Sequence, residues 1–357
     1  MFMRLFFFLL LAQPCAAADL PGMSQFIDEM VSKYGYQRDE LVQIFERTQH
    51  LPAVINAMSL PSTAKPWIDY RANFLDDKRI KEGLKFWQQH EQTLSWAEWE
   101  YGVPQEIMVA IIGVETMYGR NAGRHNTLDA LTTLAFDYPR RAVFFRSELE
   151  HYLELAREQE WDIFKVKSSY AGALGIPQFM PSSYLNYAED YNNDNLIDLL
   201  NDPVDAIGSV GNYFKRHGWQ SGEPVAVLAK VGEKALAGDL KAVRNLASWA
   251  DEDVTPVVKI ETLVVKVETL EGKETTRAKK ESPEIETPEV EIDTSAKLLD
   301  FTVANGKEYW LTFNNFRVIT RYNNSNFYAM SVYQLADVLR NTRKLENADR
   351  ATSGKTK

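Results

Sequence analysis

The sequence predicts an α+β protein that is mainly α, with a small β-rich domain towards its C-terminal end. Apolar residues recur at helical spacing from Phe26 to about Arg157, as in the stripe formed by Ile80, Leu84, Trp87, Leu94 and Tyr101. Short runs rich in Val and Leu then replace this pattern, which is typical of strands. The length of 357 residues suggests two or three domains, and the composition, 45% hydrophobic and 25% charged, is that of a globular protein.

The charge balance argues against nucleic acid as a partner. The chain carries 40 basic and 50 acidic residues, a formal net charge of −10, and much of this excess lies in residues 251–297. No basic patch emerges that would bind a polyanion. Residues 268–294 also contain almost no aromatic side chains, so we expect a flexible acidic insertion there.

The first eighteen residues have the pattern of an export signal. Arg4 supplies positive charge, the apolar run Leu5 to Ala12 is too short to span a bilayer, and small residues end the segment. We therefore expect a signal peptide over residues 1–18 and an exported, periplasmic protein. The single cysteine, Cys15, excludes an internal disulfide. Lipidation at Cys15 would associate the protein with the outer membrane, but Pro14 stands where a small residue is required.

Helix-capping residues and strand patterns mark the elements further along the chain. After a loop-rich stretch, 167–201, a helix is expected from the N-cap Asp202 and Pro203 to just before Gly218. Strand patterns follow over residues 224–231, 260–267, 298–303 and 309–313. Ser325 caps a last helix, and the polar tail after Asn347 is expected to fray.

A carboxylate falls on the apolar face of one predicted helix. Pro104 opens this helix and Gly119 closes it, and Glu115 shares a stripe with Ile107, Ile111, Val114 and Tyr118. Burial and the helix C-terminus both disfavour the charged form, so they raise the pKa of Glu115, as a general acid requires. The alternative interpretation is a structural ion pair with Arg120, Arg140 or Arg141.

A second unusual stretch, residues 168–183, combines small residues with Gln178, Phe179 and Met180. Small residues allow close backbone approach, an amide can bind hydroxyl or N-acetyl groups, and an aromatic ring and a thioether can cover a sugar face. Tight helix packing around the small residues is the alternative.

Four motifs occur in order along the chain: Glu115-Thr-Met-Tyr-Gly, Ser169-Tyr-Ala-Gly-Ala-Leu-Gly with Gln178-Phe-Met-Pro-Ser-Ser, Asn201-Asp-Pro-Val-Asp-Ala-Ile-Gly-Ser-Val, and Arg321-Tyr-Asn-Asn-Ser. Together they resemble the membrane-bound lytic murein transglycosylase B family of bacteria. The resemblance runs from about residue 20 to residue 340 and fails only across the acidic insertion. It implies a lysozyme-like catalytic core. The expected organisation is an N-terminal helical domain (19–100), this core (101–222), the β-rich domain (223–320), a helix returning to the cleft (321–347) and a disordered tail (348–357).

The resemblance also implies the reaction. Family members cleave the β-1,4 bond between N-acetylmuramic acid and N-acetylglucosamine of peptidoglycan and leave 1,6-anhydromuramoyl ends. By analogy Glu115 is the catalytic acid and then the base, and no cofactor takes part in catalysis. The substrate contacts implied by the resemblance are Tyr70, Arg141, Ser169, Gln178, Phe179, Met180, Tyr213, Tyr322, Asn323 and Tyr328.

Residues 190–205 have the pattern of a calcium loop. Asp190, Asn192, Asp194 and Asp198 stand at ligand positions 1, 3, 5 and 9, and the Leu196 carbonyl is available at position 7. Two departures are Asn195 in place of Gly at position 6 and Asn201 in place of Glu at position 12. The resemblance implies a longer loop whose last ligand is Asp205, and a structural Ca²⁺. The alternative is that the acidic residues serve only the start of the following helix.

Two other functions remain open at this point. A muramidase would hydrolyse the same bond with water and would bring a second carboxylate to the cleft, for which Asp129 and Asp137 are candidates. A non-catalytic protein would use the same groove only to bind peptidoglycan. Glycan strands are the expected partner in each case, and other cell-wall enzymes are further candidates.

Overall fold

The computed structural model describes residues 20–59, 65–257 and 294–353, which form two compact units. Unit 1 consists of Met1–Pro61 and Ala122–Asn186, and unit 2 consists of Ser62–Asn121 and Tyr187–Lys357. The expected signal peptide with Cys15, the expected strand over 260–267 and nearly all of the acidic insertion lie outside the described residues.

Unit 1 is built from helices that pack around α8 and α9. Phe26 makes edge contacts with Phe45 and Phe136, and Leu131 and Tyr152 are fully buried. A two-residue antiparallel pair joins β1 to β2. The elements are α1 (Met23–Tyr34), α2 (Arg38–Arg47), α3 (Pro52–Ser59), β1 (His125–Asn126), α8 (Thr127–Asp137), the 3-10 turn η2 (Pro139–Arg141), α9 (Ala142–Glu158), β2 (Lys167–Ser168) and α10 (Pro181–Tyr187), which reaches the boundary with unit 2.

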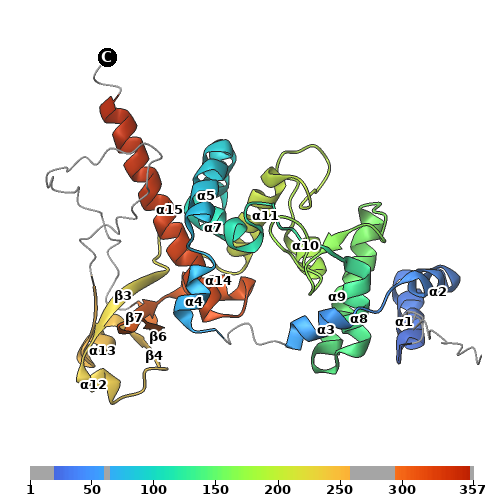
Figure 1. The fold of residues 1–357 in the computed structure, drawn as a ribbon, viewed down its shortest axis with the longest axis horizontal. Coiled ribbons are helices and arrows are strands. Elements are labelled where there is room, and N and C mark those ends of the chain that lie inside the picture. Colours follow the sequence, from blue (N-terminus) through green and yellow to red (C-terminus); the bar gives the residue numbers. More distant parts are fainter. Residues whose placement is uncertain (1–19, 60–64, 258–293, 354–357) are drawn as a thin grey trace, which may run out of the picture. The chain divides into compact units, whose positions relative to one another are not determined.

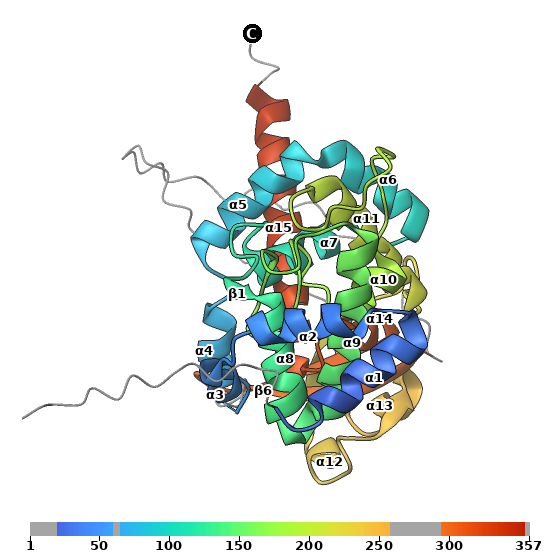
Figure 2. The ribbon, with the colours of Figure 1, turned by 90° about the vertical axis from the view of Figure 1, so that its right-hand side faces the viewer.

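The helical part of unit 2 surrounds α7, which is buried along nearly its whole length. Helices α5, α6, α11 and α15 all contact α7 (Figure 1, Figure 2). Such a helix is apolar on all sides because every side faces a neighbour. The helices are α4 (Trp67–Ala72), α5 (Asp77–Gln89), α6 (Glu91–Tyr101), α7 (Gln105–Thr116), α11 (Pro203–Arg216), α14 (Asn314–Tyr322) and α15 (Asn326–Ser353).

The β part of unit 2 is a five-stranded antiparallel sheet with the strand order β4-β6-β7-β3-β5. Its core gathers around Trp249, which is 1% exposed and donates a hydrogen bond from Nε1 to the carbonyl of Ala296 at 3.0 Å. Three of the expected strands are confirmed. The elements are β3 (Ala226–Val231), α12 (Glu233–Leu236), β4 (Val243–Asn245), α13 (Leu246–Asp251), β5 (Val254–Pro256), β6 (Ser295–Val303) and β7 (Gly306–Thr312).

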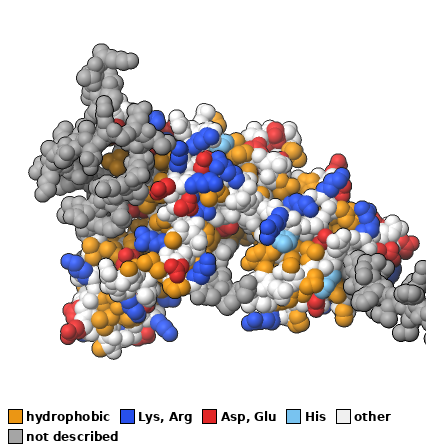
Figure 3. Space-filling model, viewed as in Figure 1, with side chains coloured by type: hydrophobic (Ala, Val, Ile, Leu, Met, Phe, Trp, Pro, Cys, Tyr) orange, Lys and Arg blue, Asp and Glu red, His pale blue; other side chains and the backbone are white. Residues whose placement is uncertain are grey.

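Local signals predicted α11 and the start of α15 well. The Asp202 side chain accepts a hydrogen bond from the Val204 N–H, and Gly218 follows the helix with φ of 89°. At the start of α15, the Ser325 hydroxyl accepts from the Tyr328 N–H at 3.3 Å. On the face shown in Figure 3, acidic and basic side chains lie interspersed among hydrophobic ones.

Three boundaries differ from expectation. Helix α7 ends at Thr116 rather than near Gly119, because Met117 and Tyr118 adopt left-handed backbone conformations with φ of 52° and 61°. Helix α15 continues to Ser353, so the expected disordered tail is helical over 348–353; no Gly or Pro interrupts it there. The expected N-terminal domain, 19–100, is divided near residue 61, because α3 packs on α8 whereas α5 packs on α7.

Close packing between α6 and α11 gives a stability prediction. A Cβ atom at Gly211 would lie 2.3 Å from Cδ2 of Tyr101, so Gly211→Ala must displace a buried ring. We expect this overpacking to outweigh the helix propensity of alanine and to lower the free energy of unfolding by roughly 1–3 kcal/mol. Urea unfolding measures the change, with Lys215→Ala at an exposed position of α11 as the control. Equal stability of Gly211→Ala and wild type would contradict the packing described here.

Candidate active site

Glu115 lies one residue before the end of α7 and is the only half-buried residue in an otherwise buried run from Ile107 to Thr116. Tyr328 in the first turn of α15 is 2% exposed, and its hydroxyl donates a hydrogen bond to Glu115 Oε1 at 2.5 Å. This contact joins two helices that pack against each other along unit 2. The carboxyl group is therefore held by a neutral donor.

The protonation state of Glu115 follows from this environment. Burial raises its pKa from the ordinary value of 4.5 to about 7, and the hydrogen bond from Tyr328 opposes part of that rise. The expected alternative was an ion pair with a neighbouring arginine. Within unit 2, however, Arg120 pairs with Glu82, and no described cation of the unit pairs with Glu115. The group thus has the pKa of a general acid and base at neutral pH.

Tyrosines from three further elements accompany Glu115. The negative charge of Glu115, together with burial as the larger cause, raises the pKa of Tyr70 on α4 and of Tyr322 at the end of α14. Tyr213 on α11 is 4.8 Å from Tyr322 between ring centroids, and its hydroxyl donates to the Arg321 carbonyl at 2.8 Å. The structure therefore brings together Glu115, Tyr70, Tyr213, Tyr322 and Tyr328.

The motif at residues 321–325 forms the turn between α14 and α15. Tyr322 ends the first helix, Asn323 is exposed, and its carbonyl accepts the Ser325 N–H at 2.7 Å. This turn explains why Tyr322 and Tyr328, six residues apart, both lie near the carboxylate. It also leaves Asn323 in contact with solvent.

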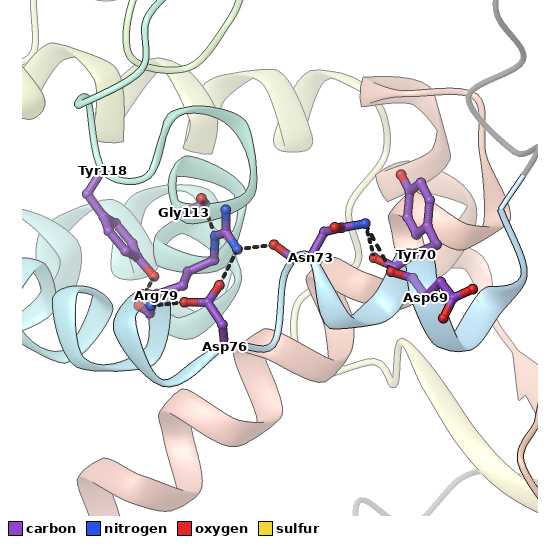
Figure 4. A network of polar contacts seen from close by, with 7 residues as sticks. All are labelled: Asp69, Tyr70, Asn73, Asp76, Arg79, Gly113 and Tyr118. Carbon is purple, nitrogen blue, oxygen red and sulfur yellow. Dashed lines mark hydrogen bonds and ion pairs between the residues drawn. The ribbon is translucent and has the colours of Figure 1, made fainter.

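Four residues near the site were not predicted from the sequence: Trp67, Phe301, Phe327 and Arg79. Tyr70 packs against Phe327, and both rings contact Trp67, which in turn lies 4.8 Å from Phe301 of strand β6 between centroids. Arg79 on α5 was also missed, although its buried guanidinium contacts the backbone of α7 (Figure 4). Their contact partners Phe301, Phe327 and Gly113 lie far from them in the chain, so no spacing pattern could reveal these contacts.

The small-residue stretch belongs to unit 1. Ser169 Oγ accepts the backbone N–H groups of Ala171 and Ala173, at 3.3 and 3.0 Å. Gln178 takes a left-handed conformation, with φ of 54°, and its Nε2 donates to the carbonyls of Ala122 and Gly175 at 3.0 and 2.9 Å. The side-chain amide of Gln178 therefore stabilises the conformation of its own loop.

Phe179 and Met180 differ in exposure. Phe179 is 2% exposed and its backbone pairs with Leu174, so its ring contributes to packing in unit 1, whereas Met180 is half-buried. Packing also explains Gly172, where a Cβ atom would lie 2.3 Å from Leu131. The alternative of tight packing is thus correct for part of this stretch.

Arg141 and the two candidate second carboxylates also belong to unit 1. The guanidinium of Arg141 lies 4.2 Å from the centroid of the Phe144 ring and 5.2 Å from that of Phe145, so it makes cation–π contacts with both. Asp129 accepts the Gln49 N–H at 2.8 Å, and Asp137 contacts His50 at 2.8 Å. Both carboxylates therefore have structural roles within their own unit.

The loop over 190–205 is folded around its own carboxylates. Asn195, which stands where calcium loops have Gly, takes the left-handed conformation with φ of 71°. Asp190 accepts the Asp194 and Asn195 N–H groups, at 3.0 and 2.8 Å. Within the described residues, no three His, Cys, Asp or Glu side chains converge closely enough to hold a metal ion.

Asp205 is the buried member of this loop. It is 0% exposed, and its two oxygens accept the N–H groups of Tyr191 and Asp198, each at 2.8 Å. Burial raises its pKa, and the nearby charge of Asp202 adds to the rise. The donor types in this loop, carboxylate and amide oxygens, are those that calcium prefers, although the carboxylates do not converge on one point in this structure.

The chain is similar to known proteins over nearly its whole length. A family model described as "Transglycosylase SLT domain" matches residues 19–337. Membrane-bound lytic murein transglycosylase B of Escherichia coli K12 is 40% identical over 332 residues, which cover 90% of this chain and 83% of that protein.

Two solved structures extend the comparison. The Escherichia coli lytic transglycosylase Slt35 in complex with calcium matches with a TM-score of 0.76 and 40% identity, over 91% of this chain and 94% of that chain. SltB3 of Pseudomonas aeruginosa in complex with NAG-anhNAM-pentapeptide matches with a TM-score of 0.71 and 27% identity, over 89% and 78%. The expected fold class, mainly α with a β region and a lysozyme-like core, is confirmed. The chain therefore belongs to the transglycosylase SLT domain family, whose lytic members are lyases that cleave peptidoglycan.

Proposed function

We propose that Glu115 is the acid and the base of a lytic transglycosylase reaction, in which the chain cleaves the β-1,4 bond between N-acetylmuramic acid and N-acetylglucosamine. The observation that carries this proposal is the half-buried carboxyl group whose pKa lies at about 7 and whose hydrogen-bond partner is a tyrosine. Such a group is protonated in a large fraction of molecules at neutral pH, and it can also take a proton back.

The reaction has two steps that balance without water. Protonated Glu115 first gives its proton to the glycosidic oxygen as the C1–O bond breaks, and the substrate's N-acetyl oxygen stabilises the positive charge at C1. The C6 hydroxyl oxygen then bonds to C1 and gives its proton to the Glu115 carboxylate. Tyr328 holds Oε1 in place, which orients Oε2 as the atom that carries the proton. Glu115 ends the cycle protonated, as it began.

The intramolecular nucleophile has an entropic advantage over water. A well-oriented group in the same molecule acts at an effective concentration on the order of 10⁵ M or more, far above that of bulk water. The relative SltB3 was solved with an anhydro-muramoyl peptide, which supports this product class for the present chain. The proposed substrate contacts are Tyr70, Tyr213, Tyr322, Asn323 and Tyr328 in unit 2 and Arg141, Ser169, Gln178, Phe179 and Met180 in unit 1.

The competing functions have weaker support. A muramidase requires a second carboxylate, and the candidates Asp129 and Asp137 are already bonded to partners within unit 1. A protein that only binds glycan gains nothing from a carboxyl group whose pKa burial has raised. Peptidoglycan strands are the proposed partner.

Digestion of purified sacculi in ¹⁸O-labelled water tests the function. We expect muropeptides that end in anhydromuramic acid and carry no label, because no water enters the reaction. Glu115→Gln keeps the shape of the side chain but lacks the transferable proton, so it should fold normally and lose all but a trace of turnover. Label at C1 of muramic acid would convert the assignment to a muramidase, and one tenth or more of wild-type activity in Glu115→Gln would identify another acid.

The pH dependence tests the role of Tyr328. Because the first step needs protonated Glu115, kcat should fall as the pH rises through about 7. Tyr328→Phe removes a hydrogen bond that favours the carboxylate, so the pKa of Glu115 should rise and the alkaline limb of the profile should move to higher pH. Tyr333→Phe, on the same helix but bonded to the Ala226 carbonyl at 2.7 Å, is the control and should leave the limb unchanged. Coincident profiles for Tyr328→Phe and wild type would contradict this role.

We further propose that the loop over 190–205 binds a structural Ca²⁺ through Asp190, Asn192, Asp194, the Leu196 carbonyl, Asp198 and Asp205. The left-handed Asn195, the buried Asp205 and the calcium complex of the relative Slt35 support this proposal. Since the carboxylates bond to backbone N–H groups in this structure, calcium would have to draw them together. The ion would stabilise the loop and take no part in catalysis.

Thermal unfolding with and without calcium tests the loop. In chelator-stripped protein, calcium should raise the melting temperature by mass action on the folded state. Asp190→Ala combined with Asp194→Ala should abolish the rise, whereas Asp239→Ala, outside the loop, should retain it. An unchanged melting temperature from micromolar to millimolar calcium would reject the site.

The periplasm is the proposed location of the protein, because residues 1–18 have the pattern of an export signal. Within residues 20–59, 65–257 and 294–353, no helix is both long and apolar enough to cross a bilayer. Lipidation at Cys15 would add an association with the outer membrane. Other cell-wall enzymes are proposed as further partners.

A further inference from the structure

Arg79 on α5 is a buried arginine that the proposed reaction does not use. Its residue is 8% exposed, which is rare for arginine unless the guanidinium is fully partnered. We propose that Arg79 is a positioning residue that fixes Glu115 relative to Tyr70 by joining the C-terminal ends of α7 and α4. This inference rests on the proposed role of Glu115.

The guanidinium bridges the ends of the two helices (Figure 4). Arg79 Nε donates to the Gly113 carbonyl at 3.0 Å, two residues before Glu115, and Nη1 donates to the Asn73 carbonyl, three residues after Tyr70. The Asn73 side chain in turn donates from Nδ2 to the Tyr70 carbonyl at 3.1 Å. A single planar group thus connects the last turn of each helix.

Electrostatics favour this arrangement. The last carbonyls of a helix lack partners within it and carry partial negative charge, so a cation there is stabilising. The Gly113 carbonyl also accepts the Met117 N–H at 3.1 Å, and Arg79 is therefore its second donor. Asp76 contacts Nη1 at 2.7 Å and, with its other oxygen, caps α5 by accepting the Arg79 N–H at 2.9 Å. The buried charge is consequently paired and oriented.

The backbone of Arg79 holds the other side of Glu115. The Tyr118 hydroxyl donates to the Arg79 carbonyl at 3.0 Å, and the Tyr118 ring fills space beside Gly83 and Gly113. A Cβ atom on either glycine would lie 2.3 or 2.5 Å from the Tyr118 hydroxyl oxygen, so both positions require glycine. Tyr118 itself is left-handed, with φ of 61°. Arg79 therefore contacts the chain two residues before and three residues after Glu115.

Lysine cannot replace this geometry. Its single ammonium group keeps the charge but cannot reach two carbonyls and a carboxylate with fixed, coplanar donors. In Arg79→Lys the last turn of α7 should shift, and a displacement of about 1 Å at a catalytic group can cost roughly 10²-fold in rate. The Tyr70 ring is also held by Trp67 and Phe327, so the shift should fall mainly on Glu115 and substrate affinity should change little.

Steady-state kinetics on soluble glycan strands test the inference, together with melting temperatures. We expect Arg79→Lys to lower kcat roughly 10- to 100-fold with KM within about twofold of wild type. Tyr118→Phe removes only the hydrogen bond to the Arg79 carbonyl, so it should lower kcat by a smaller factor. Arg343→Lys is the matched control: Arg343 bonds to Glu91 and lies 4.4 Å from the Trp87 ring centroid, so kcat should persist even if stability falls.

The outcomes are separable. Wild-type kcat in a folded Arg79→Lys variant would overturn the inference, as would a rise in KM with kcat unchanged. If Arg79→Lys does not fold, Tyr118→Phe provides the test: a lowered kcat supports the inference, and a wild-type kcat overturns it. Substantial activity in Glu115→Gln would overturn the proposed function itself, whereas an inactive Glu115→Gln beside a fully active Arg79→Lys would overturn only the role of Arg79.

Discussion

The desolvation of Glu115 is the constraint on which the rest of unit 2 depends. Helices α5, α6, α11 and α15 enclose α7, and the carboxyl group acquires a pKa of about 7 only because these neighbours exclude water from the helix end. A buried carboxyl group stabilised by one tyrosine is unfavourable for folding compared with an apolar residue. Unit 2 tolerates this local cost because α7 is apolar and buried from Ile107 to Val114.

The sheet contributes to the site from a distance. Phe301 of β6 packs on Trp67, and Trp67 packs on Tyr70 and Phe327, so the aromatic contacts run from the β domain to the tyrosines around Glu115. Aromatic pairs of this kind add stability beyond the apolar area that they bury. The β domain is therefore a support for one side of the site, and this role does not require it to touch a substrate.

Periodicity and capping residues predicted much of this fold. Glu115 could be identified because it occupies an apolar position of a 3.6-residue repeat, and Asp202, Pro203 and Gly218 marked the ends of α11. Arg79, Trp67 and Phe301 could not be identified, because their partners come from distant parts of the chain and only the tertiary fold brings them together. The early end of α7 was missed for a related reason: Tyr118 adopts φ of 61° to reach Gly83 and Arg79, which local propensity does not encode.

The way in which each unit combines two chain segments has a consequence for synthesis. Unit 1 cannot finish folding until the segment that ends at Asn186 has been synthesised and packs on the one that ends at Pro61. Unit 2 cannot finish folding until α15 has been synthesised. Helix α15 supplies Tyr328 and covers α7, yet it is the last described element to leave the ribosome. Until then Glu115 lacks this partner and this cover. The order of synthesis therefore delays assembly of the active site until the chain is nearly finished.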